Sequence, residues 1–183
     1  ALEDFKGAKF DLNKAILINK EKSFYDDLKV AEIYEKIGCL NTCLYEKDEA
    51  LLSFSKAIDL NPKLLSAYGL KAEYLYTTFK DSEAALLCCS KALNLGIEEP
   101  DILRVLYVKS NIKINTQIPE EAMDAIRDIN KMINIHQRFY HNERSLDNKL
   151  GEYYLLKAKA TEILRLKNAT AEIPFYDYRG GGI

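Results

Sequence analysis

Residues 31–64 read AEIYEKIGCLNTCLYEKDEALLSFSKAIDLNPKL, and this stretch decides the fold. Small residues recur in it at fixed intervals. Gly38 lies twelve positions before Ala50, and Phe54 and Ala57 follow Ala50 at spacings of four and three. Such spacings place side chains on one face of an α-helix. A proline five positions after Ala57 ends the run. The stretch therefore predicts two helices joined by a short turn.

The same pattern recurs along the chain. The segment ends AILIN (15–19), AIDLN (57–61) and ALNLG (92–96) align, and each closes a run of apolar residues with helical periodicity. The second copy carries, at the matching positions, Tyr68, Ala72, Ala85, Cys89 and Ala92, after a turn one residue longer than in the first. The third copy is less regular and carries Ser110, Ala122, Ile126 and Ile129.

This spacing resembles the tetratricopeptide repeat, a 34-residue helix–turn–helix unit. The resemblance covers roughly residues 8–166 and is most specific in 31–64, where Tyr34 and Gly38 stand in place of the family's Trp and Gly. Asn41 departs from the family's usual Tyr. The resemblance implies an all-α fold, a right-handed α-solenoid of antiparallel helix pairs with about three repeat units plus flanking helices.

The repeats divide the chain into six segments. We expect residues 1–22 to be the second helix of an incomplete leading repeat, 23–64 a unit with an extended first helix, 65–100 a second unit, 101–135 a degenerate third, 144–168 a capping helix and 169–183 a non-helical tail. Ser23 with Asp26 predicts the start of the extended helix. Residues 134–145 are expected to form a polar connection. The leading unit lacks its first helix, which indicates a fragment of a larger protein.

Composition limits the classes of function. The chain has 183 residues, with 26 Lys plus Arg against 28 Asp plus Glu and a net charge of −2. Both signs are interspersed, so no extended positive surface is expected and nucleic acid is an unexpected partner. No apolar stretch is long enough to span a bilayer, and we therefore expect no membrane insertion.

The four cysteines lie inside helix-patterned segments and lack the spacing of a disulfide framework. Adjacent Cys88 and Cys89 take the place of packing residues. Cys39 and Cys43 are one helical turn apart, and we interpret them as packing residues too. This usage predicts an intracellular, reducing compartment, either cytoplasm or nucleus.

Groups for catalysis or metal binding are scarce. The two histidines, His136 and His141, fall in the expected polar connection, with no cysteine or acidic pair at ligand spacing beside them. No nucleophile with an adjacent base and no phosphate-binding loop occurs. We therefore expect no enzyme, no catalytic residue, no cofactor and no metal.

The resemblance places a partner-binding groove on the first helices, with positions counted from Gly38, Ala72 and Ser110. The candidate groove residues are Glu32, Glu35, Lys36, Leu70, Glu73, Tyr76, Arg104, Tyr107, Val108, Asn111 and Ile114, and Cys39, Thr42 and Ser66 share the face. Tyrosines are common anchors in protein recognition. Each of these residues could equally be packed between units.

One subset of the family clamps the C-terminal carboxylate of heat-shock chaperones with Lys, Asn and Arg. The matching positions here carry Glu35, Cys39, Gly69 and Glu73. The two acids would repel a carboxylate. We therefore expect a ligand of basic or aromatic and apolar character.

The resulting expectation is a non-catalytic protein–protein interaction module, a scaffold or adaptor that binds a peptide segment or subunit in the concave groove. The alternative is a small chaperone of the bacterial-secretion type, which binds an extended segment of its client. A homodimer through the solenoid ends is also possible. The aromatic tail segment 174–179 either docks on the solenoid or is disordered.

Overall fold

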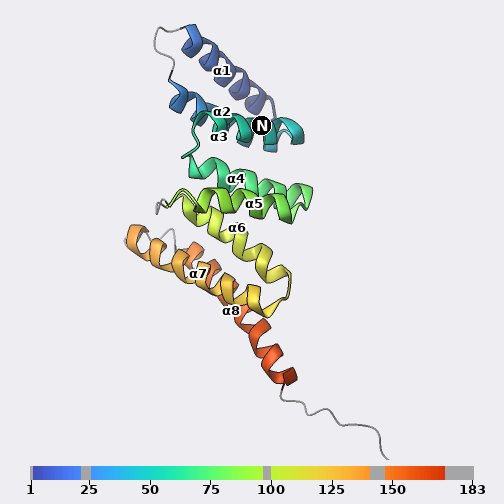
Figure 1. Cartoon of the computed structure of the whole chain (residues 1–183). Coiled ribbons are helices and arrows are strands. Elements are labelled where there is room, and N and C mark those ends of the chain that lie inside the picture. Colours follow the sequence, from blue (N-terminus) through green and yellow to red (C-terminus); the bar gives the residue numbers. More distant parts are fainter. Residues whose placement is uncertain (1, 22–25, 97–99, 141–146, 172–183) are drawn as a thin grey trace, which may run out of the picture. The chain divides into compact units, whose positions relative to one another are not determined.

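The computed structural model describes residues 2–21, 26–96, 100–140 and 147–171, and these residues form helices and turns with no strand among them. The all-α prediction is therefore confirmed over the described residues. The elements are α1 (Leu2–Glu21), α2 (Asp27–Cys43), α3 (Lys47–Leu60), α4 (Leu65–Tyr74), the π-helical turn η1 (Leu75–Phe79), α5 (Ser82–Leu93), α6 (Ile102–Asn115), α7 (Pro119–Tyr140) and α8 (Asp147–Ala171) (Figure 1).

The chain divides into two compact units, residues 1–109 and 110–183, with the division inside α6. In the first unit α2 packs against α3 and α4 against α5, while α1 lies on α2 and α3 lies on α4 (Figure 1). In the second unit α7 packs against α8. Helices that follow one another in the sequence are therefore neighbours in space within each unit.

Two of the helices begin at an aspartate whose side chain caps the helix. The carboxylate of Asp26 accepts from the backbone N–H of Lys29 at 3.2 Å, and that of Asp81 accepts from Ala84 at 2.9 Å. Each bond satisfies one of the N–H groups that a helix start leaves without a partner. The bond from Lys29 also lowers the pKa of Asp26. Asp26 is thus the cap of α2, and Ser23 lies outside the described residues.

Three of the connections between helices contain a residue with positive φ. Tyr45, Lys80 and Gln117 have φ values of 60°, 58° and 59°, in the left-handed region that side chains rarely adopt. They stand between α2 and α3, between η1 and α5, and between α6 and α7. A residue with left-handed backbone therefore recurs in these connections at intervals of 35 and 37 residues, close to the period read in the sequence.

The small residues permit close packing of α2 on α3. A Cβ atom added at Gly38 would lie 2.5 Å from the ring of Phe54, closer than real Cβ contacts allow. Phe54 is 1% exposed, and Ala50 and Ala57 are fully buried. Gly38 therefore leaves the space that the Phe54 ring fills, as its place in the sequence pattern predicts.

Two contacts between successive helix pairs repeat at the sequence period. The ammonium group of Lys71 on α4 donates to the Ser55 hydroxyl of α3 at 2.9 Å. The thiol of Cys89 on α5 donates to the carbonyl of Val105 on α6 at 3.6 Å, and both residues stand 34 positions after the first pair. Equivalent positions are therefore in contact at the α3–α4 and α5–α6 junctions, the first through two side chains and the second through a backbone carbonyl.

The π-helical turn accounts for the longer turn of the second copy. Leu75–Phe79 follows α4 without a break and widens the helix locally. A π-helical turn takes up an additional residue within a helix. It also places Phe79 edge-on to Tyr74, with 5.9 Å between the ring centroids. Tyr74 is in turn edge-on to Phe54, with 6.4 Å between the ring centroids.

In the second unit the helix after Pro119 is longer than expected. α7 continues to Tyr140, so the predicted polar connection is wrong from 134 to 140. His136 is 5% exposed and packs on the rings of Tyr140 and Tyr153, at 5.2 and 5.7 Å. The reason is that His136 continues the apolar stripe of Ile129 and Ile133 at helical spacing.

The end of the chain is described only in part. α8 extends to Ala171, three residues past the expected end of the capping helix, and Lys167 on α8 forms an ion pair with Glu120 on α7 at 2.6 Å. His141 and residues 172–183 lie outside the described residues, as does the proposed docking of segment 174–179.

Candidate protein-binding face

Within the first unit, the candidate residues of α2, α4 and α6 form one surface, here called the first-helix face. It is defined by Glu32, Glu35, Lys36, Cys39, Ser66, Gly69, Leu70, Glu73 and Arg104. Glu32, Lys36 and Arg104 are exposed, and Glu35, Leu70 and Glu73 are half-buried. The face therefore presents charged groups of both signs to solvent.

Two side-chain contacts connect the helices across this face. The hydroxyl of Ser66 on α4 donates to the carboxylate of Glu35 on α2. The guanidinium of Arg104 on α6 forms an ion pair with Glu73 on α4. Each contact joins residues 31 positions apart, the first between α2 and α4 and the second between α4 and α6. The side chains of these four residues are consequently held in defined positions.

Gly69 determines how Arg104 lies. A Cβ atom added at Gly69 would meet Cγ and Cδ of Arg104 at 3.0 Å, so the arginine stem crosses α4 at the glycine. The side chains of Arg104 and Glu73 are 49% and 40% exposed. An ion pair this exposed contributes little to stability, and its main effect is to fix the direction of the guanidinium.

Cys39 lies within the field of the same charges. Burial is the main cause of its raised pKa, and the negative charge of Glu35 raises the pKa further, whereas Arg104 lowers it. The thiol therefore stays protonated near neutral pH, the state in which cysteine is a poor nucleophile. The shared influence of Glu35 and Arg104 places these three residues in one cluster.

Some of the predicted groove residues lie elsewhere. Val108 and Ile114 are 3% and 5% exposed, so the prediction that they face a groove is wrong. The reason is that α6 is buried on most sides, and counting from Ser110 could not show which side remains open. Tyr76 and Tyr107 are half-buried and make interactions within the chain. Asn111 and Ile114 belong to the second unit.

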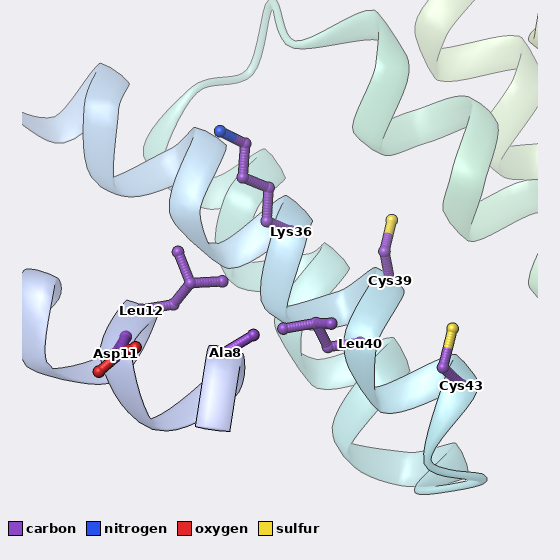
Figure 2. A pocket seen from close by; sticks show the side chains of 7 residues that line it. All are labelled: Ala8, Asp11, Leu12, Lys36, Cys39, Leu40 and Cys43. Atoms are coloured by element: carbon purple, nitrogen blue, oxygen red, sulfur yellow. The ribbon is translucent and has the colours of Figure 1, made fainter. Parts of the chain in front are cut away.

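A pocket of about 530 Å³ opens between α1 and α2 (Figure 2). Its walls are Ala8, Asp11 and Leu12 on α1 and Lys36, Cys39, Leu40 and Cys43 on α2. Figure 2 shows Ala8 and Leu12 directed toward α2 and the two thiols along one side of that helix. The sequence pattern did not predict this pocket, because Cys39 and Cys43 stand at positions typical of packing residues, whereas Cys43 is exposed.

Other reactive groups do not assemble into a site. Among the described residues no three His, Cys, Asp or Glu side chains are grouped so as to hold a metal ion. Cys88 and Cys89 are buried, as expected for packing residues, and burial raises the pKa of Cys88. No helix within the described ranges has the length and apolar character needed to cross a membrane.

Comparison with known proteins identifies the fold alone. No protein-family model matches the chain, and neither does any curated protein sequence. A crystal structure described as BtubC (BKLC) from P. vanneervenii superimposes with a TM-score of 0.61 at 14% sequence identity. The match covers 98% of this chain and 80% of that one. The chain therefore shares a helical fold with that protein.

Proposed function

We propose that the chain is a non-catalytic protein-binding module of the tetratricopeptide-repeat type, a scaffold or adaptor that holds a peptide segment or a subunit on its first-helix face. The observation that carries the proposal is the pair of contacts Ser66–Glu35 and Arg104–Glu73. They fix polar side chains of three helices, half-buried at Glu35, Ser66 and Glu73 and exposed at Arg104, before any partner arrives. Side chains that are already ordered lose less conformational entropy on binding.

The charges of the face favour a basic ligand. Arg104 is already engaged by Glu73, and Glu32 and Glu35 add two carboxylates on α2. A ligand carboxylate would meet these acids, with Arg104 already paired and Lys36 as the other cation among the residues that define the face. A peptide with Lys or Arg next to apolar residues would be attracted by the acids and would cover Leu70 and the stem of Arg104.

The test is selection of short random peptides by phage display against the immobilised chain, followed by titration of the selected peptides. The informative variant is the double exchange Glu73→Lys with Arg104→Glu, which keeps an ion pair at this place but reverses its direction. We expect basic, partly apolar peptides to be selected, and their affinity to fall about tenfold in the double variant.

The matched control is Lys91→Glu, an exposed charge reversal on α5, outside the first-helix face. It should leave the affinity unchanged. Selection of acidic peptides, or equal loss of affinity in the double variant and in the control, would contradict the proposal.

A further inference from the structure

Three helices of the first unit carry equivalent rows of residues. Alignment of the segment ends 15–19, 57–61 and 92–96 defines them by position. The α1 row is Ala8, Asp11 and Ala15, the α3 row is Ala50, Ser53 and Ala57, and the α5 row is Ala85, Cys88 and Ala92. The α3 and α5 rows are buried throughout, whereas in the α1 row Ala8 and Asp11 are exposed and Ala15 is half-buried.

The buried rows are each covered by the helix that precedes them. On the α3 row lies α2, whose Asn41 amide donates to the Ser53 hydroxyl at 3.2 Å. On the α5 row lies α4, where the Cys88 thiol contacts the carbonyl of Tyr68 at 3.5 Å. The covering helix brings a small residue to each row, Gly38 and Ala72, and both are buried.

The α1 row has no covering helix among the described residues, and the pocket opens over Ala8 and Asp11. α1 is held in place by contacts with α2 and with the residue that precedes α3. Ile16 is buried in a cluster with Val30 and Ile37 of α2, and Lys9 forms an ion pair with Glu46. These contacts hold α1 beside α2, with the pocket between the two helices.

We propose that this pocket binds an amphipathic helix of a partner protein, in the position that α2 occupies on α3. The pocket shares Lys36 and Cys39 with the first-helix face. The proposal nevertheless rests on the comparison of the α1, α3 and α5 rows and not on the function assigned to that face. The two covered rows, on α3 and α5, predict which residues this partner helix should carry.

The first requirement concerns the size of the partner residue that packs over Leu12. Leu12 stands where α3 has Phe54, and Phe54 requires Gly38 above it. Leucine is smaller than phenylalanine, so the partner helix should carry Gly or Ala above Leu12. A larger side chain would hold the two helices apart and leave voids along the row.

The second requirement concerns charge on the two walls. Asp11 stands where Ser53 accepts from Asn41, so the partner residue there should be a donor with positive charge. Lys36 stands two 34-residue periods before Arg104, which pairs with Glu73. The partner helix should therefore place a carboxylate toward Lys36. Opposite charges on the two walls also fix the direction of the helix.

The probe is a fluorescent synthetic peptide with the 17-residue sequence of α2. The peptide carries Glu35→Gln, which avoids repulsion by Glu32 of the protein. It also carries Cys39→Glu to pair with Lys36 of the protein and Asn41→Lys to pair with Asp11. Its remaining substitutions are Gly38→Ala and Cys43→Ser. A control peptide differs only in carrying Asn41→Asp. Binding to the full chain is measured by fluorescence anisotropy, and alkylation of Cys43 is followed by mass spectrometry, because this exposed thiol lines the pocket.

We expect the probe to bind the wild-type chain about tenfold more tightly than the control peptide. Asp11→Lys in the protein should reverse this preference, and Ala8→Gln, which fills the pocket, should weaken binding by a similar factor. Lys6→Glu, a charge reversal on the opposite side of α1, should change nothing. Saturating probe should slow the alkylation of Cys43. Asp11, Ala8 and Lys6 are all exposed, so these variants should keep the fold, which circular dichroism checks.

Three results would overturn the proposal. One is that the probe fails to bind, or binds the wild type and Ala8→Gln equally. Another is that saturating probe leaves the alkylation rate of Cys43 unchanged. The last is that sedimentation shows the chain alone to self-associate, with the association lost in Ala8→Gln, which would assign the pocket to a second copy of the chain.

Discussion

α1 and α3 carry the same row of small residues, but only one of the rows is buried. In α3 the residues Ala50 and Ala57 are fully buried under α2, whereas Ala8, the counterpart of Ala50 in α1, is exposed. The two helices have the same spacing of row residues, and they differ in whether another helix packs on that row. The comparison shows that a row of small residues indicates where another helix can pack closely. The row itself is buried only where such a helix is present.

The largest effect should come from the aromatic residue under α2. Phe54→Ala removes a ring that is 1% exposed, and we expect a loss of about 3–5 kcal/mol in the free energy of unfolding. Leu12 of α1, the counterpart of Phe54, is half-buried. We expect Leu12→Ala to lower the free energy of unfolding by about 1 kcal/mol, because the side chain is already partly open to water. Urea denaturation followed by circular dichroism measures both. Equal losses would contradict the claim that α3 is covered and α1 is not.

A smaller effect should come from the glycines. Gly38→Ala places a methyl group 2.5 Å from the Phe54 ring, and we expect it to destabilise the fold by about 1–3 kcal/mol. Gly7→Ala on α1, which has no atom within 4 Å, should instead stabilise the helix by about 0.5–1 kcal/mol. Thermal unfolding shows the sign of each change. A neutral Gly38→Ala would mean that α2 and α3 are less closely packed than described.

Helix caps allow a third comparison, between α5 and α3. Asp81 caps α5 through its side chain, whereas Glu46 at the start of α3 makes no such bond. Asp81→Ala should therefore cost about 1 kcal/mol. Glu46→Ala loses only the ion pair with Lys9 of α1 and should cost about 0.5 kcal/mol. Urea titration of the two variants gives the difference. A loss of unfolding free energy in Glu46→Ala larger than that in Asp81→Ala would contradict this expectation. It would show that the ion pair with Lys9 stabilises the position of α1 more than a partly exposed pair normally does.

The smallest change in stability is expected on the first-helix face. Arg104→Ala removes an exposed ion pair with Glu73, and we expect less than about 1 kcal/mol, decreasing further in high salt. The row residues, by contrast, act through apolar packing and should be insensitive to salt. Denaturation at low and high salt separates the two classes. A large, salt-independent loss in Arg104→Ala would indicate that its stem over Gly69 contributes to packing.

Much of the fold could be predicted from the sequence. The spacing of Gly38, Ala50, Phe54 and Ala57 predicted a helix pair, because close approach of two helices needs small residues at set intervals. The burial of Cys88 and Cys89 followed from the same alignment. These features are local and repeat along the chain, so one copy supports the interpretation of the next.

The binding site was less predictable, for a physical reason. Exposure of a residue depends on which helices cover it, and sequence spacing within one helix does not contain that information. Val108 was therefore placed on the wrong side of a helix that is apolar on most sides. His136 was assigned to a loop because of its polarity, although its spacing from Ile129 and Ile133 continues the apolar stripe of α7. The pocket beside Ala8 was missed because nothing in α1 itself distinguishes a covered row from an open one.

The most direct test of this account compares Ala8→Cys with Ala50→Cys, each in a background where Cys39→Ser and Cys43→Ser remove the accessible native thiols. The rate of alkylation under native conditions reports whether each row position is open. We expect the thiol at position 8 to react readily. The thiol at position 50 should react about 100-fold more slowly, because its reaction requires local unfolding. Equal rates at the two positions would contradict the claim that α3 is covered and α1 is open.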